Sequence, residues 1–335
     1  MRRACFALAL TAPSIATANE GEIIDAAVEA HIRPGFAALA SESAALAEQA
    51  ASDCAPTSAP LREAFHDAFD AWVSVSHLRF GPTEADNRAF ALAFWPDPRG
   101  KTPKALAQLA RDEDSIIADA EGFRTVSVAA RGFYALERLL YAPPDGAKAT
   151  YLCELTIAVA QDIAATSAEI EADWRTRYAP LMRAPYPEAG PYRNEEDALR
   201  ALFTALTAGL KFTSELRLGR PLGTVERPRP RRAEARLSER SLRHVEVSLA
   251  ATRALSEHLS SDDPDVAAEL SAAFDRAMEA AARIDGPVLA SVETPQGRLR
   301  VEALQQRIDE VRATLGRTLG PALGVAEGFN ALDGD

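Results

Sequence analysis

The sequence lacks several common catalytic motifs and has few cysteines. It contains no HExxH, no nucleophile-elbow GxSxG, no P-loop and no dinucleotide fingerprint. The usual signatures of zinc peptidases, α/β-hydrolases, P-loop proteins and Rossmann enzymes are therefore missing. Only three cysteines occur, and two of them are expected to pair, so a thiol nucleophile is not indicated. The apolar run near the N-terminus is far shorter than the ~20 residues of a membrane span.

Runs rich in Val, Ile and Thr with a period of two are nearly absent, which argues against β-sheet. Hydrophobic residues make up 47% of the 335 residues, and alanine is abundant. This composition predicts an all-α protein, and the length favours two domains over one. The formal net charge of −12 argues against non-specific nucleic-acid binding, because an acidic protein is repelled by phosphates.

Residues 1–18 have the features of a secretory signal peptide. Arg2 and Arg3 form a basic start, an apolar core follows, and Ala16-Thr17-Ala18 offers a cleavage site with small residues. No cysteine follows the apolar run directly, so a lipid anchor is not indicated. The alternative is an N-terminal helix, but the sequence favours a soluble exported protein.

Export would leave two cysteines in the mature chain. Cys5 would be removed with the signal, and Cys54 and Cys153 would remain. Two cysteines in an oxidising compartment predict one disulfide. It would close a loop of about 100 residues and tie the end of the first helix to the start of the fourth long helix, stabilising the fold by about 4–5 kcal/mol in the chain-entropy description.

Apolar residues at three- and four-residue steps predict helices along most of the chain. The predicted helices cover residues 23–51, 59–80, 104–120, 126–141, 151–178, 195–216, 237–259, 264–284 and 295–319. Pro34 is expected to kink the first, because proline removes a helix hydrogen bond. Several prolines between residues 180 and 191 mark a linker. It separates a first helical bundle, residues 19–184, from a second, residues 192–335.

The helix predicted over residues 126–141 carries the most site-like pattern. Its polar stripe includes Tyr134 and Glu137, which are three residues apart, so both can point at one spot. Arg131 lies on the same stripe. Gly132 would sit within this helix, where glycine costs roughly 1 kcal/mol relative to alanine, so a close approach by another helix or a ligand is expected. Ordinary surface chemistry is the alternative explanation of this stripe.

Other polar residues are weaker candidates for a site. His31 and His77 could ligate a metal, although a lone histidine such as His31 is more often packed or capped than a ligand. His66 and Asp70, four residues apart, could clasp a metal, but an exposed polar face explains them better. Asp97 stands between prolines in the long irregular stretch 83–103, where Trp95 is expected as a buried plug. It is either a site carboxylate or a turn-forming residue.

Two further stretches bear on organisation and ligand. Residues 76–82 and 214–221 both run through Leu-Arg, an apolar residue and Gly before reaching Pro, which suits a duplicated bundle. Residues 227–232 read Arg-Pro-Arg-Pro-Arg-Arg. Proline keeps this basic stretch out of a helix. It is expected to pair with the acidic surface of the protein itself or with an anionic ligand.

With these residues in view, the chain resembles the imelysin family of exported bacterial proteins. The resemblance is carried by residues 31–34, 72–82, 94–99, 132–141 and 218–241, the last with its Leu-Gly-Arg-Pro-Leu-Gly. It implies two helical bundles related by a degenerate internal repeat and a periplasmic or outer-membrane-associated location. It also implies a link to iron uptake, with iron as the ligand or cofactor, and it brings a peptidase label.

One departure from the family pattern affects the expected chemistry. The family signature is GxHxxE, and the matching stretch here is Gly132-Phe133-Tyr134-Ala135-Leu136-Glu137, with tyrosine in place of histidine. Phenolate and carboxylate oxygens are harder ligands than imidazole and would favour ferric iron. The tyrosine would then have to lose its proton to the metal.

Three functional hypotheses follow. The first is a non-enzymatic, exported binding protein for iron or another metal, acting with envelope proteins of an uptake system. Its site residues would be Tyr134, Glu137, Asp97, His31 and His77, with Arg99 or Arg131 holding an anion. The second is a metallopeptidase with Glu137 as general base. The third is a non-catalytic scaffold whose site has decayed.

Overall fold

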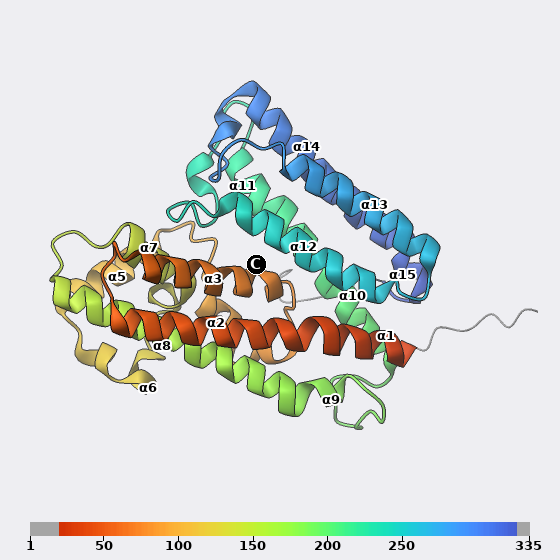
Figure 1. Ribbon diagram of the computed structural model, residues 1–335, viewed down its shortest axis with the longest axis horizontal. Coiled ribbons are helices and arrows are strands. Elements are labelled where there is room, and N and C mark those ends of the chain that lie inside the picture. The colour runs from red at the N-terminus through yellow and green to blue at the C-terminus, as the bar shows by residue number, and fades with distance from the viewer. Residues whose placement is uncertain (1–19, 327–335) are drawn as a thin grey trace, which may run out of the picture.

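The computed structural model describes residues 20–326 of the chain, and within this range it contains helices and turns but no strand (Figure 1). The predicted all-α class is therefore confirmed. The predicted signal peptide, residues 1–18, lies outside the described residues. No helix between residues 20 and 326 combines the length and the apolar character that crossing a bilayer requires.

The first group of helices packs around α2. Helix α2 lies against α3 and α8, and α7 packs on α8. The longer helices of this group are α2 (Arg33–Ser52), α3 (Ala59–Val75), α5 (Lys101–Asp112) and α8 (Ala149–Asp173). Shorter helices are α1 (Glu20–Ala27), α4 (Arg88–Leu92), α6 (Ala120–Phe123), α7 (Gly132–Tyr141) and α9 (Ala179–Leu181), and the 3₁₀ turns span Gly81–Thr83, Ala85–Asn87, Ser115–Ala118 and Val128–Ala130.

The second group of helices forms the upper layer of Figure 1. Helix α13 packs between α12 and α14, and α10 packs on both α12 and α14. The helices are α10 (Glu195–Phe212), α11 (Gly219–Leu222), α12 (Ser241–Leu259), α13 (Pro264–Ala281), α14 (Pro295–Arg317) and α15 (Leu319–Ala322), with 3₁₀ turns at Pro230–Arg232 and Ala290–Glu293.

Within residues 20–326, three helical stretches are π-helical, and one of them stands where the sequence predicts a kink. They are Val28–Ile32, Trp174–Tyr178 and Thr213–Leu218. The first stands directly before α2, whose second residue is Pro34. Proline has no backbone N–H and cannot donate the usual α-helical hydrogen bond. The chain therefore accommodates Pro34 next to a wider, π-helical turn.

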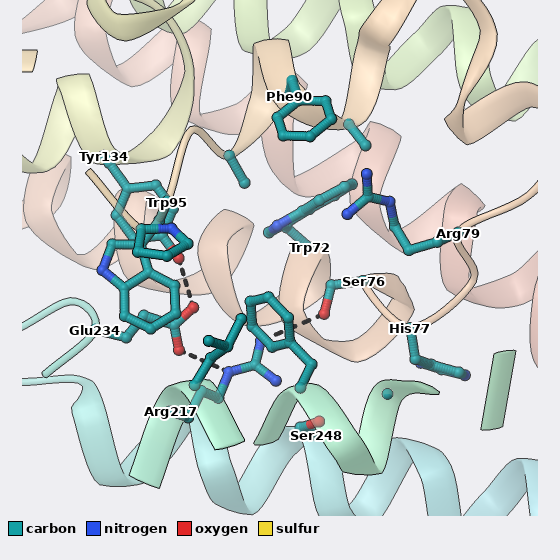
Figure 2. A pocket seen from close by; sticks show the side chains of 16 residues that line it. Trp72, Ser76, His77, Arg79, Phe90, Trp95, Tyr134, Arg217, Glu234 and Ser248 are labelled. Carbon is teal, nitrogen blue, oxygen red and sulfur yellow. Dashed lines mark hydrogen bonds and ion pairs between the residues drawn. The ribbon is translucent and has the colours of Figure 1, made fainter. Parts of the chain in front are cut away.

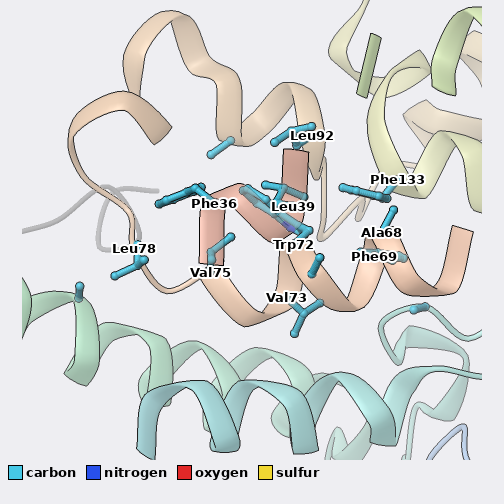
Figure 3. Packing of buried hydrophobic residues seen from close by; sticks show 14 of the residues in the cluster. Phe36, Leu39, Ala68, Phe69, Trp72, Val73, Val75, Leu78, Leu92 and Phe133 are labelled. Atoms are coloured by element: carbon cyan, nitrogen blue, oxygen red, sulfur yellow. The ribbon is translucent and has the colours of Figure 1, made fainter. Parts of the chain in front are cut away.

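The two groups meet along α3 and α12, and α1 also touches α10 and α12. Apolar side chains of α3 fill the first group's core. Figure 3 shows Phe69 and Trp72 of α3 among Phe36, Leu39 and Phe133, and the rings of Phe69 and Phe133 stack with centroids 4.7 Å apart. On its other side, Phe69 meets the ring of the second group's His244 edge-on, at 4.4 Å between centroids. The junction is therefore continuous with the core.

The predicted disulfide is present. Cys54 and Cys153 are bonded across a sequence separation of 99 residues. Cys54 follows the end of α2, and Cys153 lies in the second turn of α8. The bond thus joins the two helices that the sequence analysis expected it to join.

The helix predicted over residues 126–141 is shorter than expected. Residues 128–130 form a 3₁₀ turn, Arg131 is extended, and α7 begins at Gly132 with φ of +72°. A Cβ atom on Gly132 would lie 2.2 Å from the backbone oxygen of Leu92. The expected close approach is real, but it occurs at the start of the helix, where only glycine fits both the φ angle and the space.

Candidate functional site

The two motif residues of α7 face the second group of helices. Tyr134 and Glu137 are both buried. The hydroxyl of Tyr134 donates to Glu234 Oε1 over 2.5 Å. The backbone N–H and the hydroxyl of Ser238 donate to Glu137 Oε1 over 2.9 and 2.7 Å. The two side chains therefore bind different residues of one connecting segment, between α11 and α12, and do not converge on a single point.

Glu234 is the centre of a buried polar network. Its Oε2 accepts from Arg217 Nε over 2.7 Å and lies 3.2 Å from His244 Nδ1. Its backbone oxygen accepts from the hydroxyl of Ser241. Figure 2 shows Tyr134, Glu234 and Arg217 linked in one chain of contacts. A buried carboxylate is costly unless it is paired and hydrogen-bonded, and here it has a cation and a hydroxyl on its two oxygens.

These contacts shift the pKa values of Glu234, Tyr134 and Glu137 in different directions. Burial alone would raise the pKa of Glu234, but Arg217, His244 and the Tyr134 hydroxyl lower it to about 2. Burial, and then the charge of Glu234, raise the pKa of Tyr134 well above its usual value. Burial also raises the pKa of Glu137, against the lowering effect of Ser238. At neutral pH Tyr134 is a phenol that donates its proton to an ionised Glu234.

Two cavities border this network. The smaller cavity has a volume of about 120 Å³ and is lined by His77, Arg217 and Glu234 among others. The larger cavity has a volume of about 300 Å³ and is lined by Asp97 and Glu137 among others. Trp95 and Tyr134 line both cavities, and their rings stack with centroids 6.3 Å apart. The aromatic pair therefore forms part of the wall of each.

The larger cavity is rich in arginine. Its lining includes five arginines: Arg138, Arg220, Arg231, Arg232 and Arg236. They come from three places, namely α7, α11 and the segment that leads to α12. Arg138 and Arg220 are half-buried, whereas the other three are exposed. The positive charge thus comes from both groups of helices and shares the cavity lining with Glu137.

Residues 32–315 match a peptidase-family model described as Imelysin. The chain belongs to the imelysin family. Solved structures share its fold, among them the following two. An imelysin-like protein from Psychrobacter arcticum 273-4 has a TM-score of 0.77 at 21% identity, covering 92% of this chain and 97% of that one. A candidate iron-regulated protein A precursor from Parabacteroides distasonis ATCC 8503 has a TM-score of 0.69 at 15% identity, covering 88% and 94%. No curated protein matches the chain.

The four residues expected to ligate a metal in this imelysin are divided among separate places. The imidazoles of His31 and His77 contact each other, with 3.1 Å between their Nε2 atoms. His77 lines the smaller cavity, Glu137 lines the larger one, and Tyr134 lines both, whereas His31 lines neither. In the part of the chain that the structure describes, no group of three or more His, Cys, Asp or Glu residues is arranged to hold a metal ion.

The His31–His77 pair is a packed contact at the junction. Burial, and then the nearby His258, lower the pKa of His31 to about 4. Burial and the neighbouring His31 lower the pKa of His77 well below its usual value. The ring of His258 lies 6.4 Å from that of His31. At neutral pH the pair is uncharged, and one imidazole donates its proton to the other.

The remaining predicted residues have structural partners. Both carboxylate oxygens of Asp97 accept backbone N–H groups, from Lys101 and Thr102, each over 2.8 Å. The carboxylate thus holds the start of α5, as the turn-forming alternative expected, while it also lines the larger cavity. Trp95 is half-buried rather than fully buried.

Neither arginine that was predicted to hold an anion is at the site. Arg131 is buried and makes a two-pronged contact with Asp162, with N–O distances of 2.7 and 2.9 Å. Arg99 is exposed and lines neither cavity. The cavity arginines are different residues. Two of them, Arg231 and Arg232, belong to the basic stretch for which the sequence left an anionic ligand open.

His66 and Asp70 do not clasp a common site either. His66 Nε2 lies 2.8 Å from the hydroxyl of Tyr141. Asp70 pairs with Arg240 and Arg243 of the second group, the latter over 2.9 Å. The polar-face explanation of these two residues agrees with these contacts, and Asp70 adds an ionic link across the junction.

The two similar Leu-Arg segments lie close together at the smaller cavity. Ser76 and Arg79 line it from the first group, and Leu216 and Arg217 line it from the second. Arg217 also approaches the Ser76 hydroxyl over 3.5 Å. The backbones differ, since Gly81 has φ of +60° whereas Gly219 is helical. An internal repeat remains a prediction, but the residues that indicated it do border the site.

Proposed function

We propose that this imelysin-family chain is a non-enzymatic, exported binding protein that serves iron acquisition, and that its ligand occupies the larger cavity beside Tyr134 and Glu137. The observation that carries the site is the cavity itself. It stands between the two groups of helices, and the motif residues form part of its wall. Sites between packed units are a common place for small ligands.

Family membership and shared fold support the connection to iron, whereas the candidate metal-binding side chains do not. Family membership and the fold shared with a candidate iron-regulated protein favour a role in iron handling. A bare metal ion on Tyr134 and Glu137 fits poorly, because Glu234 accepts the phenol proton and Ser238 occupies one carboxylate oxygen. We therefore expect iron to arrive already complexed.

The same donors argue for binding rather than peptide hydrolysis. A catalytic zinc site needs three protein ligands, most often including histidine. The lining of the larger cavity contains no histidine among the described residues, and the His244 imidazole, which acts on Glu137 electrostatically, contacts Glu234. The residues around Glu137 thus do not fit a catalytic metal.

The test is the metal content of protein purified from its native compartment, measured by elemental mass spectrometry. Wild type is compared with Glu137→Gln, which keeps an oxygen for Ser238, and with Glu48→Ala, an exposed residue of α2 that lines neither cavity. We expect iron in the wild type and in Glu48→Ala and a loss in Glu137→Gln. Iron absent from all three would contradict the iron role.

A further inference from the structure

The larger cavity concentrates positive charge in an acidic protein. Its lining contains five arginines and two carboxylates, Asp97 and Glu137, although the whole chain has a formal charge of −12. Asp97 already accepts two backbone N–H groups of α5, and one oxygen of Glu137 is held by Ser238. The two acids are thus hydrogen-bonded to other groups, and five arginines against two carboxylates leave the lining with an excess of positive charge.

The cavity arginines also lack the carboxylate partners that many other arginines of this protein have. Arg183 pairs with Asp25 and Glu29, and Arg253 pairs with Glu257 and Asp275. Among the described residues, none of the five cavity arginines forms an ion pair with a carboxylate. Arginines are normally paired where they are withdrawn from water. The two half-buried members of this set, Arg138 and Arg220, are therefore the ones whose lack of a carboxylate partner suggests an anionic ligand.

Arg220 has the least favourable surroundings of the five arginines. It is half-buried, and its Nε is shielded from solvent without a hydrogen-bond partner. Its guanidinium lies over the ring of Trp95, 5.5 Å from the centroid. Burial, and then the charge of Arg232, lower its pKa. A cation held beside another cation and away from water is unfavourable by itself, and a bound anion would offset that cost.

We propose that the larger cavity binds an oxyanion with two or more negative charges, held by Arg138, Arg220, Arg231, Arg232 and Arg236. The planar guanidinium fork matches carboxylate and phosphate oxygens in pairs. A volume of about 300 Å³ suits a compact small molecule. The inference rests on the proposed function in placing the ligand here, and it deepens that function: iron would enter as an anionic ferric chelate.

The test is isothermal titration calorimetry of the full mature chain with four probes: citrate, inorganic phosphate, ferric citrate and ferrous chloride. The variants are Arg220→Gln and the exposed Arg232→Gln, with Arg276→Gln of α13 as the control, an exposed arginine outside both cavities. We expect at least one oxyanion to bind, and each cavity variant to weaken it by about tenfold or more, while Arg276→Gln changes nothing. We also expect binding to weaken as salt rises.

The two probe classes identify the source of the oxyanion. Binding of citrate but not phosphate would assign a polycarboxylate, and the reverse would assign a phosphate. Because both cavity variants remove like-charge repulsion, the unliganded variants should melt at the wild-type temperature or above it. A lower melting temperature in both variants would indicate structural arginines and would contradict the proposal.

The outcomes separate this inference from the proposed function. Oxyanion binding with no preference for ferric citrate over citrate would support the inference and count against the iron role. Ferrous iron binding that the arginine variants leave unchanged, without oxyanion binding, would support the iron role and overturn the inference. No binding of any probe would overturn both.

Discussion

Glu234 carries the chemical link between the two groups of helices, and its removal should be costly. Glu234→Ala leaves Arg217 buried without a counter-charge, a change that costs about 3–5 kcal/mol of folding free energy. Tyr134→Phe removes only the hydroxyl that donates to Glu234, so we expect a loss of about 1.5–3 kcal/mol. Urea unfolding of both variants measures the difference. Equal losses would mean that Arg217 does not depend on Glu234.

The pH dependence of stability should report the same carboxylate. The pKa of Glu234 falls from its ordinary 4.5 to about 2 in the folded protein. The unfolded chain therefore takes up a proton first as pH falls. The contribution of Glu234 is complete above pH 4.5, declines below it, and is lost near pH 2, amounting to about 3 kcal/mol.

The measurement is urea unfolding of wild type and Glu234→Gln between pH 6 and pH 2.5. The stability of Glu234→Gln should fall less steeply with acid below pH 4.5. The histidines add an earlier decline in both proteins, because His31 stays neutral down to about pH 4 in the folded state while the unfolded histidine binds a proton near its ordinary 6.5. Parallel curves below pH 4.5 would show that Glu234 is not the titrating group.

At the level of single residues, the sequence indicated Tyr134 and Glu137 but not the residues that bind them. Tyr134 and Glu137 were found from their three-residue spacing, which is local. Their partners Glu234 and Ser238 lie 100 and 101 residues further along the chain, and no periodicity connects residues so far apart. The same holds for Arg131, which was predicted to hold an anion: its partner Asp162 lies 31 residues away, beyond the reach of local spacing.

Gly132 fixes the start of α7 and so sets the position of Tyr134 and Glu137. Gly132→Ala should destabilise the fold severely, because its Cβ would meet the backbone oxygens of Leu92 and Ala91 at 2.2 and 2.3 Å. Gly146→Ala is the matched control. It has the same φ of +72° but nothing within 4 Å of its Cβ, so it should cost only the left-handed strain, about 1–2 kcal/mol. Denaturant unfolding measures both, and similar losses would contradict the clash.

Element boundaries were predicted well where caps are local and less well where tertiary contacts decide. Apolar periodicity located the long helices, including α8 and α12. The start of α7 was placed six residues too early, because an approaching backbone at Leu92 dictates it and the sequence holds no sign of that neighbour. The predicted helix over residues 59–80 ends at Val75, so that His77 lies in the following turn.

On the scale of the whole molecule, the disulfide stabilises one half only. The bond between Cys54 and Cys153 closes a separation of 99 residues within the first group of helices. Cys54→Ser with Cys153→Ser should lower stability by about 4–5 kcal/mol if chain entropy is the cause. The melting temperature with and without reductant measures this in the wild type. A reductant effect that persists in the double variant would show a cause other than this bond.

The predicted division into residues 19–184 and 192–335 remains a prediction, and the packing adds a detail that sequence reasoning could not reach. Helix α1 belongs to the first half in sequence but packs on α10 and α12. Together with α3, it covers the junction beside which the cavities lie. Which amphipathic faces pair across the junction depends on the whole assembly, and single-helix patterns do not specify it.

Trp95 gives the protein a built-in optical reporter. Of the three tryptophans, Trp72 and Trp174 are buried, at 4% and 1% exposure, and only Trp95 lines the larger cavity. Its indole lies beneath the guanidinium of Arg220. An occupant that draws this cation away would change the electric field on the ring. The intrinsic fluorescence of the unlabelled chain should therefore follow filling of the cavity in real time.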